Sequence, residues 1–348
     1  MKVLITGGAG FIGSALVRVV LAQGCKVINL DKFTYSGRQE NLTDASLDEN
    51  YTLVKGDVCD RSLVKEIFAH ENPNVVFHLA AESHVDRSID DSAEFVRTNV
   101  VGTHNLVQSA VDYFESLGAP DQRLFRFVHV STDEVFGSLQ EGEYFSEEMP
   151  YRPNSPYAAT KASSDHIVRA ANKTFGLPTL VCHPANNFGP RQHPEKLIPL
   201  CLLNALDSQP IPVYGDGSQI RDWIYVEDTV AAFWAIFKKG VPGDSYCISA
   251  ESSRHNIDVI NMICTVLDKI IPHSSGPYYR LISHVADRAG HDTCYQSSAE
   301  KLRSAIGWSP TVPFEEGLER TVKWYLENKT WWQSLRDARK RQGIRKAR

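Results

Sequence analysis

The glycine-rich segment near the start of the chain limits the fold more than any other feature of the sequence. Gly7, Gly10 and Gly13 follow an apolar run, Lys2–Thr6, and stand before or within the first turn of a segment with helix-like apolar spacing, Phe11–Ala22. Gly7 permits a tight turn, Gly10 lets the backbone approach a ligand, and Gly13 allows close packing of helix on strand. A strand, turn and helix joined in this way predict the first unit of a doubly wound α/β fold whose helix N-terminus binds a pyrophosphate.

An acidic residue after the second predicted strand indicates which dinucleotide is bound. Asp31 follows the run Lys26–Leu30 and stands 18 residues beyond Gly13. A carboxylate at that point of the fold holds the adenosine ribose and repels a 2′-phosphate. We therefore expect NAD as the cofactor, while the positive charge of the adjacent Lys32 leaves NADP open.

Strand and helix patterns alternate through the first half of the chain. Continuous apolar runs such as Val75–Phe77 suit strands that are buried on both faces. The alternation predicts a Rossmann-type parallel sheet with helices on both faces. The predicted strands are Lys2–Thr6, Lys26–Leu30, Thr52–Lys55, Val75–Leu79, Phe127–Ser131 and Thr179–His183, and the predicted helices are Phe11–Ala22, Ser62–Phe68, Ala93–Phe114 and Tyr157–Phe175.

The pattern changes after about residue 185, where Pro, Gly and polar residues separate shorter elements. We expect residues 1–185 to form the dinucleotide-binding unit and residues 186–335 to form a smaller mixed α/β unit that binds the substrate, with exchange of elements between the units left open. Residues 336–348 hold seven basic residues and one Asp. A solvated chain end is favoured there over a nucleic-acid or partner site. The helices predicted in the second unit are Leu197–Leu206, Asp228–Lys238, Ile257–Ile270 and Phe314–Glu327.

Composition narrows the class of protein further. The 37 Lys and Arg against 42 Asp and Glu give a net charge of -5, which argues against a nucleic-acid binder. No apolar stretch approaches the roughly 20 residues of a membrane span, and the first residues resemble a strand rather than a signal peptide, so we expect a cytoplasmic protein. Seven cysteines, no two closer than 17 residues, predict buried free thiols rather than disulfides or a metal site.

Tyr157 and Lys161 stand four residues apart at the start of a predicted helix, so they share one face. A nearby ammonium favours phenolate, which predicts a lowered pKa for Tyr157 and a role as general base. The pair alone is a common surface pattern. Its weight comes from the residues predicted around it.

Thr132, Asp133 and Glu134 follow the apolar run Phe127–Val130. Ligands of a doubly wound sheet bind beyond the carboxyl ends of the strands, which is where these three residues belong. Two adjacent carboxylates resist double ionisation, so a catalytic pair is favoured there over a solvated loop.

Motifs along nearly the whole chain resemble those of the extended short-chain dehydrogenase/reductase superfamily, and within it the dTDP-glucose 4,6-dehydratase family. The Asp133–Glu134 pair and the segment Pro194–Pro199 are the specific marks. The other segments that carry the resemblance are Thr6–Gly13, Gly56–Val58, His78–Ser88, Ser131–Gly137, Ser155–Tyr157 with Lys161, Ala162–His166, Asn186–Pro190, Gln219–Trp223 and Asp287–Asp292.

The resemblance implies an NAD-dependent hydro-lyase that removes water from a nucleotide-linked glucose with no net redox change. Tyr157, helped by Lys161 and Thr132, would remove the proton of the hydroxyl on carbon 4 as the hydride leaves for NAD. Glu134 would take the proton on carbon 5, and Asp133, protonated, would donate to the hydroxyl that leaves carbon 6. The cofactor would be regenerated at each turnover and stay bound.

The resemblance also implies which residues surround the two ligands. Arg221 suits the diphosphate because a guanidinium binds phosphate oxygens in pairs. On the cofactor side stand Gly7, Gly10, Phe11, Ile12, Asp31, Lys32, Asp57, Val58, Leu79, Ala80, Ala81, Thr98, Tyr157 and Lys161. On the substrate side stand Glu82, Ser83, Thr132, Asn187, Lys196, Leu197, Pro212, Tyr214, Arg221, Asn256, Asp287 and His291.

Departures from the family pattern keep other substrates open. Phe136 and Phe188 stand where the family often has tyrosine, and Ala289 replaces a usual proline. UDP-glucose or another nucleotide-linked glucose stays open as the substrate, as do nucleotide-sugar epimerase and UDP-glucuronate decarboxylase activities; a non-catalytic NAD-binding protein is a further alternative. The resemblance implies a homodimer held by a four-helix bundle of the segments Ala93–Phe114 and Tyr157–Phe175.

Overall fold

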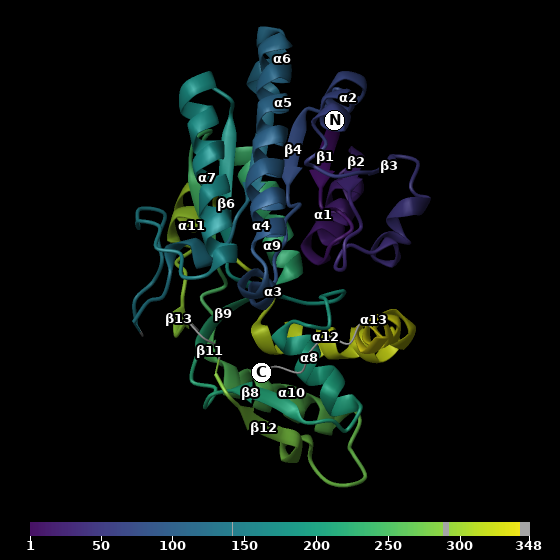
Figure 1. The fold of residues 1–348 in the computed structure, drawn as a ribbon. Helices are drawn as coiled ribbons and strands as arrows, with labels where there is room; N and C mark the ends of the chain where they lie inside the picture. Colours follow the sequence, from purple (N-terminus) through teal and green to yellow (C-terminus); the bar gives the residue numbers. More distant parts are fainter. Residues whose placement is uncertain (141, 288–291, 342–348) are drawn as a thin grey trace.

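The computed structural model describes residues 1–140, 142–287 and 292–341 (Figure 1). Its centre is a seven-stranded parallel sheet in the order β10-β6-β5-β4-β1-β2-β3, which confirms the predicted fold class. The order reverses between β1 and β4, and such a switch point opens a ligand crevice at the carboxyl ends of the strands. The strands are β1 Lys2–Thr6, β2 Lys26–Asp31, β3 Tyr51–Lys55, β4 Val75–His78, β5 Arg126–Val130, β6 Thr179–Pro184 and β10 Ser245–Ile248.

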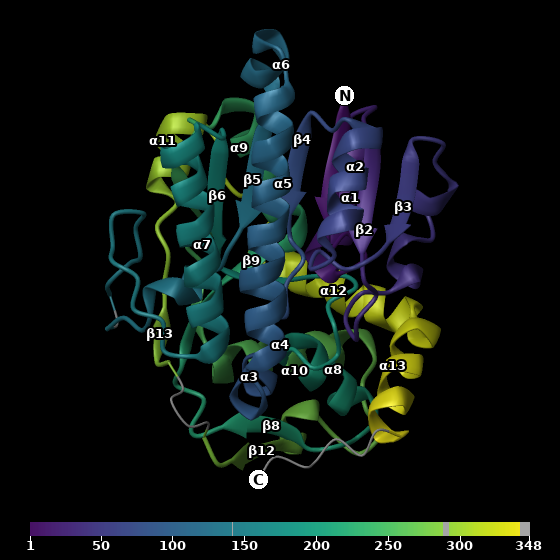
Figure 2. The same cartoon turned by 45° about the horizontal axis from the view of Figure 1, so that its top comes forward.

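Helices cover both faces of this sheet (Figures 1 and 2). On one face α1 packs against α9, and α9 against α11; on the other α2 packs against α5, and α5 against α7. Each layer has its own apolar core, because the strands are buried on both sides. The helices are α1 Phe11–Ala22, α2 Arg61–Glu71, α5 Thr103–Ser116, α7 Pro156–Phe175, α9 Val226–Lys239 and α11 Glu300–Ile306, with the short α3 Val85–Asp90 and α6 Ala119–Leu124 beside them.

The helix predicted over Ala93–Phe114 is interrupted. It consists of α4 (Ala93–Phe95), a wider π-helical stretch, η3 (Val96–Gly102), and α5. Within η3 the Asn99 amide donates to Glu82 O at 3.0 Å and to Thr160 Oγ1 at 2.9 Å. Such wider turns are frequent at functional sites, and this one ties α5 to the loop after β4 and to α7.

A smaller unit lies below the carboxyl ends of the sheet (Figure 1). In this unit β9 pairs with β7, β11 and β13, β8 pairs with β12, and the helices pack around a separate apolar core. Its strands are β7 Asn186–Phe188, β8 Ile211–Tyr214, β9 Ile220–Tyr225, β11 Ser253–His255, β12 Ile282–Val285 and β13 Cys294–Tyr295, and its helices are α8 Leu197–Leu206, α10 Asn256–Ile270, α12 Phe314–Glu327 and α13 Lys329–Arg341. Short 3₁₀ turns are η1 Gln39–Leu42, η2 Ala45–Leu47, η4 Asp133–Phe136 and η5 Tyr278–Leu281.

The chain crosses between the two units more than once. Strand β10 and helices α9 and α11 come after residue 185. Strand β10 nevertheless belongs to the seven-stranded sheet, and the two helices belong to the layer that packs with α1 on one of its faces. The sequence division at residue 185 therefore does not coincide with the division between the sheet with its helices and the smaller unit. The predicted solvated tail from Arg336 is also partly helical, since α13 runs to Arg341 and Arg336 donates to Leu203 O at 2.8 Å.

Three further features concern the predicted chemistry. All seven cysteines are unpaired, and six of them are buried. Among the described residues, no group of His, Cys, Asp and Glu side chains is arranged to hold a metal ion. No helix within the described part of the chain is long and apolar enough to cross a membrane.

Candidate active site

Two adjoining cavities lie at the carboxyl ends of the parallel strands, between the sheet and the smaller unit. The first has a volume of about 300 Å³ and is lined by the glycine turn and by the ends of β2, β4 and β5. The second has a volume of about 270 Å³ and is lined by residues of α3, α8 and β9. Both share lining residues that include Glu134, Asn187 and Lys196, so the two cavities meet at the predicted acid pair.

The glycine turn has the geometry that a pyrophosphate requires. Gly7 has a φ of +75°, and a Cβ on Gly13 would lie 2.1 Å from Gly7 O. A Cβ on Gly10 would meet only Gly7 O, at 3.3 Å, so this face of the turn is open to a ligand. Helix α1 begins without a side-chain cap, which leaves its first amide groups for an anion.

Asp31 is buried at the end of β2 beside this turn. Its carboxylate accepts from Ala9 N and from Phe33 N, each at 2.8 Å. Burial raises the pKa of Asp31, while the two backbone hydrogen bonds lower it. Lys32 lies 2.9 Å from Asp57 and 3.1 Å from Glu94, so two carboxylates offset the charge that could attract a 2′-phosphate. These residues fit NAD.

All the residues predicted on the cofactor side line the first cavity. They reach it from the glycine turn, from the loops after β2, β3 and β4, from η3 and from the first turns of α7. Ser155 caps α7 by accepting from Ala158 N at 3.0 Å, and Pro156 occupies the first turn. This N-terminus sets Tyr157 and Lys161 on the side of α7 that faces the cavity.

The catalytic side chains predicted from sequence meet in the first cavity. Thr132 has extended backbone after β5, and its hydroxyl accepts from Glu134 N at 3.3 Å, which starts the 3₁₀ turn η4. The same hydroxyl donates to Asp133 Oδ1 at 3.3 Å and hydrogen-bonds to Tyr157. Thr132 therefore connects the acid pair with the phenol.

Asp133 has the properties of an acid rather than a base. Its side chain is 2% exposed. Burial raises the pKa of Asp133 well above its usual value, and the charges of Glu134 and Asp222 raise it further. Asp133 is thus held protonated beside a second carboxyl group, as the predicted division of roles requires.

The electrostatics of the Tyr157/Lys161 pair differ from the sequence expectation. Burial, followed by the charge of Glu134, raises the pKa of Tyr157, while its hydrogen bond with Thr132 lowers it. Burial lowers the pKa of Lys161 to about 8, and its Nζ donates to Val130 O at 2.8 Å. The expected lowering of the Tyr157 pKa is wrong for these residues alone, because burial and neighbouring carboxylates outweigh the ammonium. The positive charge of an oxidised nicotinamide ring would favour phenolate.

The residues predicted on the substrate side divide between the cavities. Arg221 is buried beneath the second, where its guanidinium lies 4.3 Å from the centre of the Tyr295 ring and donates to Asp292 O at 2.8 Å. Pro212 and Asp287 line neither cavity, and His291 lies outside the described residues. Glu82, Ser83 and Thr132 line the first cavity; Leu197, Tyr214, Arg221 and Asn256 line the second; Asn187 and Lys196 line both.

Sequence reasoning missed a cluster around Glu195 at the junction of the cavities. Glu195 lies 3.5 Å from each of Arg87, His84 and His193. The Arg87 guanidinium lies 3.6 Å from the centre of the Tyr35 ring. Glu195 lies in Pro194–Pro199, one of the two segments specific to the family, and this could have indicated a role for it. No sequence pattern pointed to Tyr35.

The switch-point cavity with its Tyr157/Lys161 pair defines an NAD-binding extended short-chain dehydrogenase/reductase. Residues 4–321 match the family model described as GDP-mannose 4,6 dehydratase. The chain is 49% identical to dTDP-glucose 4,6-dehydratase of Neisseria meningitidis serogroup B over 96% of each chain. It is 48% identical to dTDP-glucose 4,6-dehydratase 1 of Escherichia coli K12 over 95% of this chain and 94% of the relative. The chain belongs to the dTDP-glucose 4,6-dehydratase family.

Solved structures agree in fold and differ in sequence distance. The dTDP-glucose 4,6-dehydratase DesIV from Streptomyces venezuelae, solved with NAD bound, is 40% identical with a TM-score of 0.88, over 96% of this chain and 100% of that one. A UDP-glucose 4-epimerase from Thermotoga maritima has a TM-score of 0.84 but 27% identity, over 94% and 100% of the two chains. The fold is thus common to dehydratases and epimerases, so the residues of the site must separate them.

Proposed function

We propose that the protein is a dTDP-glucose 4,6-dehydratase, which converts dTDP-glucose to dTDP-4-keto-6-deoxyglucose with NAD as a regenerated cofactor. The observation that carries the proposal is the buried Asp133, whose pKa is raised, beside Glu134 in the cavity that holds Tyr157 and Lys161. An epimerase has no water to eliminate and needs no such pair. The names of the full-length relatives support the same reaction.

The residues act in two stages. In the first, Tyr157 takes the proton of the hydroxyl on carbon 4, with Thr132 hydrogen-bonded to the phenol and Lys161 supplying positive charge. NAD, when bound, accepts the hydride from carbon 4 and later returns it to carbon 6. In the second stage Glu134 takes the proton on carbon 5, which the ketone on carbon 4 has made acidic, and Asp133 gives its proton to the hydroxyl leaving carbon 6.

The second cavity suits the nucleotide half of the substrate. Arg221 is aimed there by its stacking on Tyr295, and Lys196 Nζ is held by Ser83 O at 3.1 Å. Two cations suit a diphosphate. The thymine base is proposed from the relatives, since the described residues in this cavity do not select it over uracil by themselves.

The experiment is mass spectrometry of dTDP-, UDP-, CDP- and GDP-glucose after incubation with the purified protein, with and without added NAD. We expect dTDP-glucose to lose one water without net NADH formation, and Tyr157→Phe to abolish the loss. Loss of water from UDP-glucose alone would show that the substrate carries uracil instead of thymine. No loss from any of the four would contradict the dehydratase, and UDP-glucuronate and epimerisation assays would follow.

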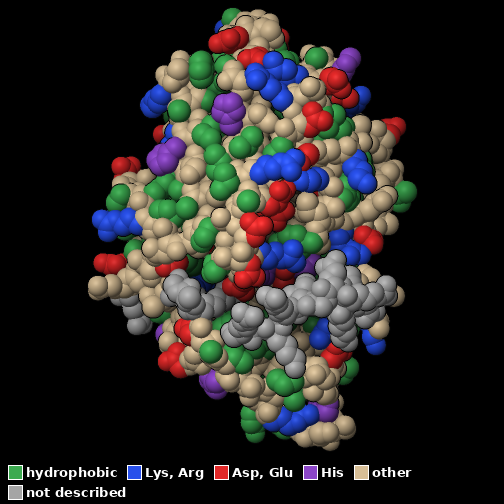
Figure 3. All heavy atoms as spheres, viewed as in Figure 1, with side chains coloured by type: hydrophobic (Ala, Val, Ile, Leu, Met, Phe, Trp, Pro, Cys, Tyr) green, Lys and Arg blue, Asp and Glu red, His purple; other side chains and the backbone are tan. Residues whose placement is uncertain are grey.

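We also propose a homodimer formed through a four-helix bundle of the segments Ala93–Phe114 and Tyr157–Phe175, which contain η3 and most of α5 and α7. Phe95, Val107 and Val111 of the first segment are buried within the chain and are not available for a contact with a second copy. Val96 and Val101, each 46% exposed, support the proposal instead, and Figure 3 shows hydrophobic side chains gathered over the region of α5 and α7. Sedimentation equilibrium should give twice the chain mass, and Val101→Glu should give the single-chain mass.

A cytoplasmic location is proposed as well. Its support is the set of seven cysteines without a disulfide, which suits a reducing compartment. Cell fractionation followed by immunodetection would test it, and recovery with an oxidised disulfide from an extracellular fraction would contradict it.

A further inference from the structure

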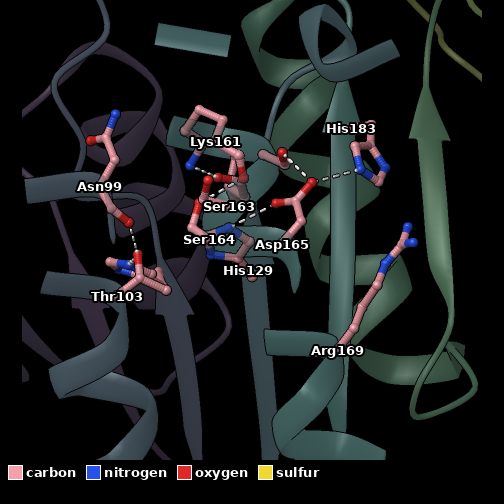
Figure 4. Close-up of polar contacts among 12 residues, drawn as sticks. Asn99, Thr103, His129, Lys161, Ser163, Ser164, Asp165, Arg169 and His183 are labelled. Carbon is pink, nitrogen blue, oxygen red and sulfur yellow. Dashed lines mark hydrogen bonds and ion pairs between the residues drawn. The ribbon is translucent and has the colours of Figure 1, made fainter. Parts of the chain in front are cut away.

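A buried carboxylate lies one helical turn beyond Lys161. Asp165 of α7 is 0% exposed, and polar groups from four other positions surround it (Figure 4). Ser131 Oγ donates to Asp165 Oδ2 at 2.7 Å and Tyr151 OH at 2.8 Å, while His183 Nε2 lies 3.1 Å from the same oxygen. His129 Nε2 lies 3.1 Å from Oδ1. The proposed reaction uses none of these side chains.

The cluster joins the two elements that carry the proposed chemistry. Ser131 immediately precedes Thr132, at the point where β5 ends and the acid pair begins. Asp165 and Lys161 are four residues apart on α7, so they share a helix face. The Ser131–Asp165 hydrogen bond therefore fixes the end of β5 against the helix that carries Tyr157.

We propose that Asp165 is a positioning residue for the oxidation step, which holds the end of β5 on α7 through Ser131 and keeps Lys161 in its ammonium form through a buried negative charge. The inference rests on the proposed function, because it assigns Asp165 to the step that Tyr157 and Lys161 perform.

The charge balance around Lys161 supports the second half of this assignment. Burial lowers the pKa of Lys161, and the charge of Asp165 opposes that effect. The hydrogen bonds and nearby histidines hold the pKa of Asp165 far below its usual value, so it stays an anion. Burial lowers the pKa of His129 to about 4, so this neighbour is neutral near pH 7 and adds no positive charge.

The remaining titratable groups come from every element packed around the cluster. Among the charges around Lys161, that of Asp165 is the one that raises the Lys161 pKa. These groups are His78 of β4, whose pKa is lowered by burial; Asp133 and Glu134 after β5; Tyr151, whose pKa is raised by burial; Cys182 and His183 of β6; Cys247 of β10, whose pKa is raised by burial; and Tyr157 and Arg169 of α7.

Asp165→Asn removes the charge and keeps the size, so it separates charge from packing. Without the anion, the pKa of Lys161 falls further below about 8, and the high-pH limb of the kcat profile should move to lower pH by about one unit or more. KM for the nucleotide sugar should change less than twofold. Ser131→Ala is the matched control, because it removes the hydrogen bond to the end of β5 but keeps the charge of Asp165. In this variant kcat should fall while the high-pH limb of its pH profile stays at the native pH.

A titration that does not depend on turnover separates this inference from the proposed function. NMR of lysine side chains labelled with ¹³C, with Lys161→Arg to identify the signal, should give a lower pKa for Lys161 in Asp165→Asn than in the native protein and Ser131→Ala. Asp165→Glu, which keeps the charge, should preserve the native value and serves if Asp165→Asn does not fold. An unchanged Lys161 pKa in Asp165→Asn, or a lowered one in Asp165→Glu, would overturn the proposal, even if the native protein dehydrates dTDP-glucose.

Discussion

Asp133 and Glu134 are neighbours in the chain with different surroundings. Asp133 is buried, accepts a hydrogen bond from Thr132 and feels the charge of Asp222, whereas Glu134 is partly exposed where the two cavities meet. In the proposed mechanism, this difference suits Asp133 to act as the acid and Glu134 to act as the base. Sequence predicted the pair because both residues follow a strand, but it could not predict which carboxyl group is the more deeply buried.

Replacing both carboxyl groups should separate oxidation from elimination. In Asp133→Asn/Glu134→Gln we expect kcat to fall by about 100-fold or more, since general acid and base catalysis are both lost. Stopped-flow absorbance should still detect transient NADH, because Tyr157 and Lys161 are intact. Dehydration at the native rate would show that other residues move these protons.

Asp133 should also make stability depend on pH. Its pKa is higher in the folded than in the unfolded chain, so its contribution to stability is lost as the pH rises toward the folded value, at up to about 1.4 kcal/mol per pH unit. Asp133→Asn should therefore have a higher Tm than the native protein, and the difference should grow from acidic to neutral pH. Thermal unfolding over a pH series checks this. A difference that stays constant with pH would mean that Asp133 ionises freely in the folded protein.

Helix α13, although it lies more than 300 residues after the glycine turn in the sequence, supports that turn through Asn41. Trp331 Nε1 donates to Asn41 Oδ1 at 2.9 Å, and Asn41 Nδ2 donates to Ala9 O at 2.8 Å. Local sequence patterns predicted the glycine turn and most helices, since periodicity and turn residues act over short distances. They could not predict this brace, the cluster around Asp165 or strand β10, because each depends on residues that meet only in the folded chain.

Trp331→Phe should weaken cofactor retention. The change keeps an aromatic ring among Trp324 and Tyr325 but leaves the buried Asn41 carbonyl without its donor, at a cost of about 1–3 kcal/mol. Less NAD should remain with the protein after gel filtration. Trp332→Phe is the control, because Trp332 Nε1 donates to Tyr325 O and does not reach the turn. Equal NAD content in both variants would show that the brace does not affect the cofactor.

The core on one face of the seven-stranded sheet is built from both halves of the chain. This core contains Phe233 of α9, Tyr246 of β10 and Leu302 of α11 together with residues of the strands that precede residue 185. The fold class could be predicted from the first 185 residues. Their need for β10 and α9, which come later in the sequence, could not.

A chain that ends at residue 185 should not form a stable NAD-binding unit. It lacks β10, which pairs with β6, and it lacks α9, which covers α1. An open strand edge and an uncovered apolar layer promote aggregation. We expect insoluble expression and no NAD retention, against a soluble full-length chain. A soluble fragment with cooperative thermal unfolding would show that the first unit folds alone.

The late arrival of β10 also orders the events during synthesis. Domains begin to fold as they emerge from the ribosome. While the residues from Pro184 to Ser245 are being added, β6 is therefore an unpaired edge strand of an incomplete sheet. The brace from Trp331 to Asn41 forms later still, once the first residues of α13 have been made. A nascent chain therefore completes the support of its glycine turn only after α13 has been synthesised, so full retention of NAD should come later than formation of the sheet.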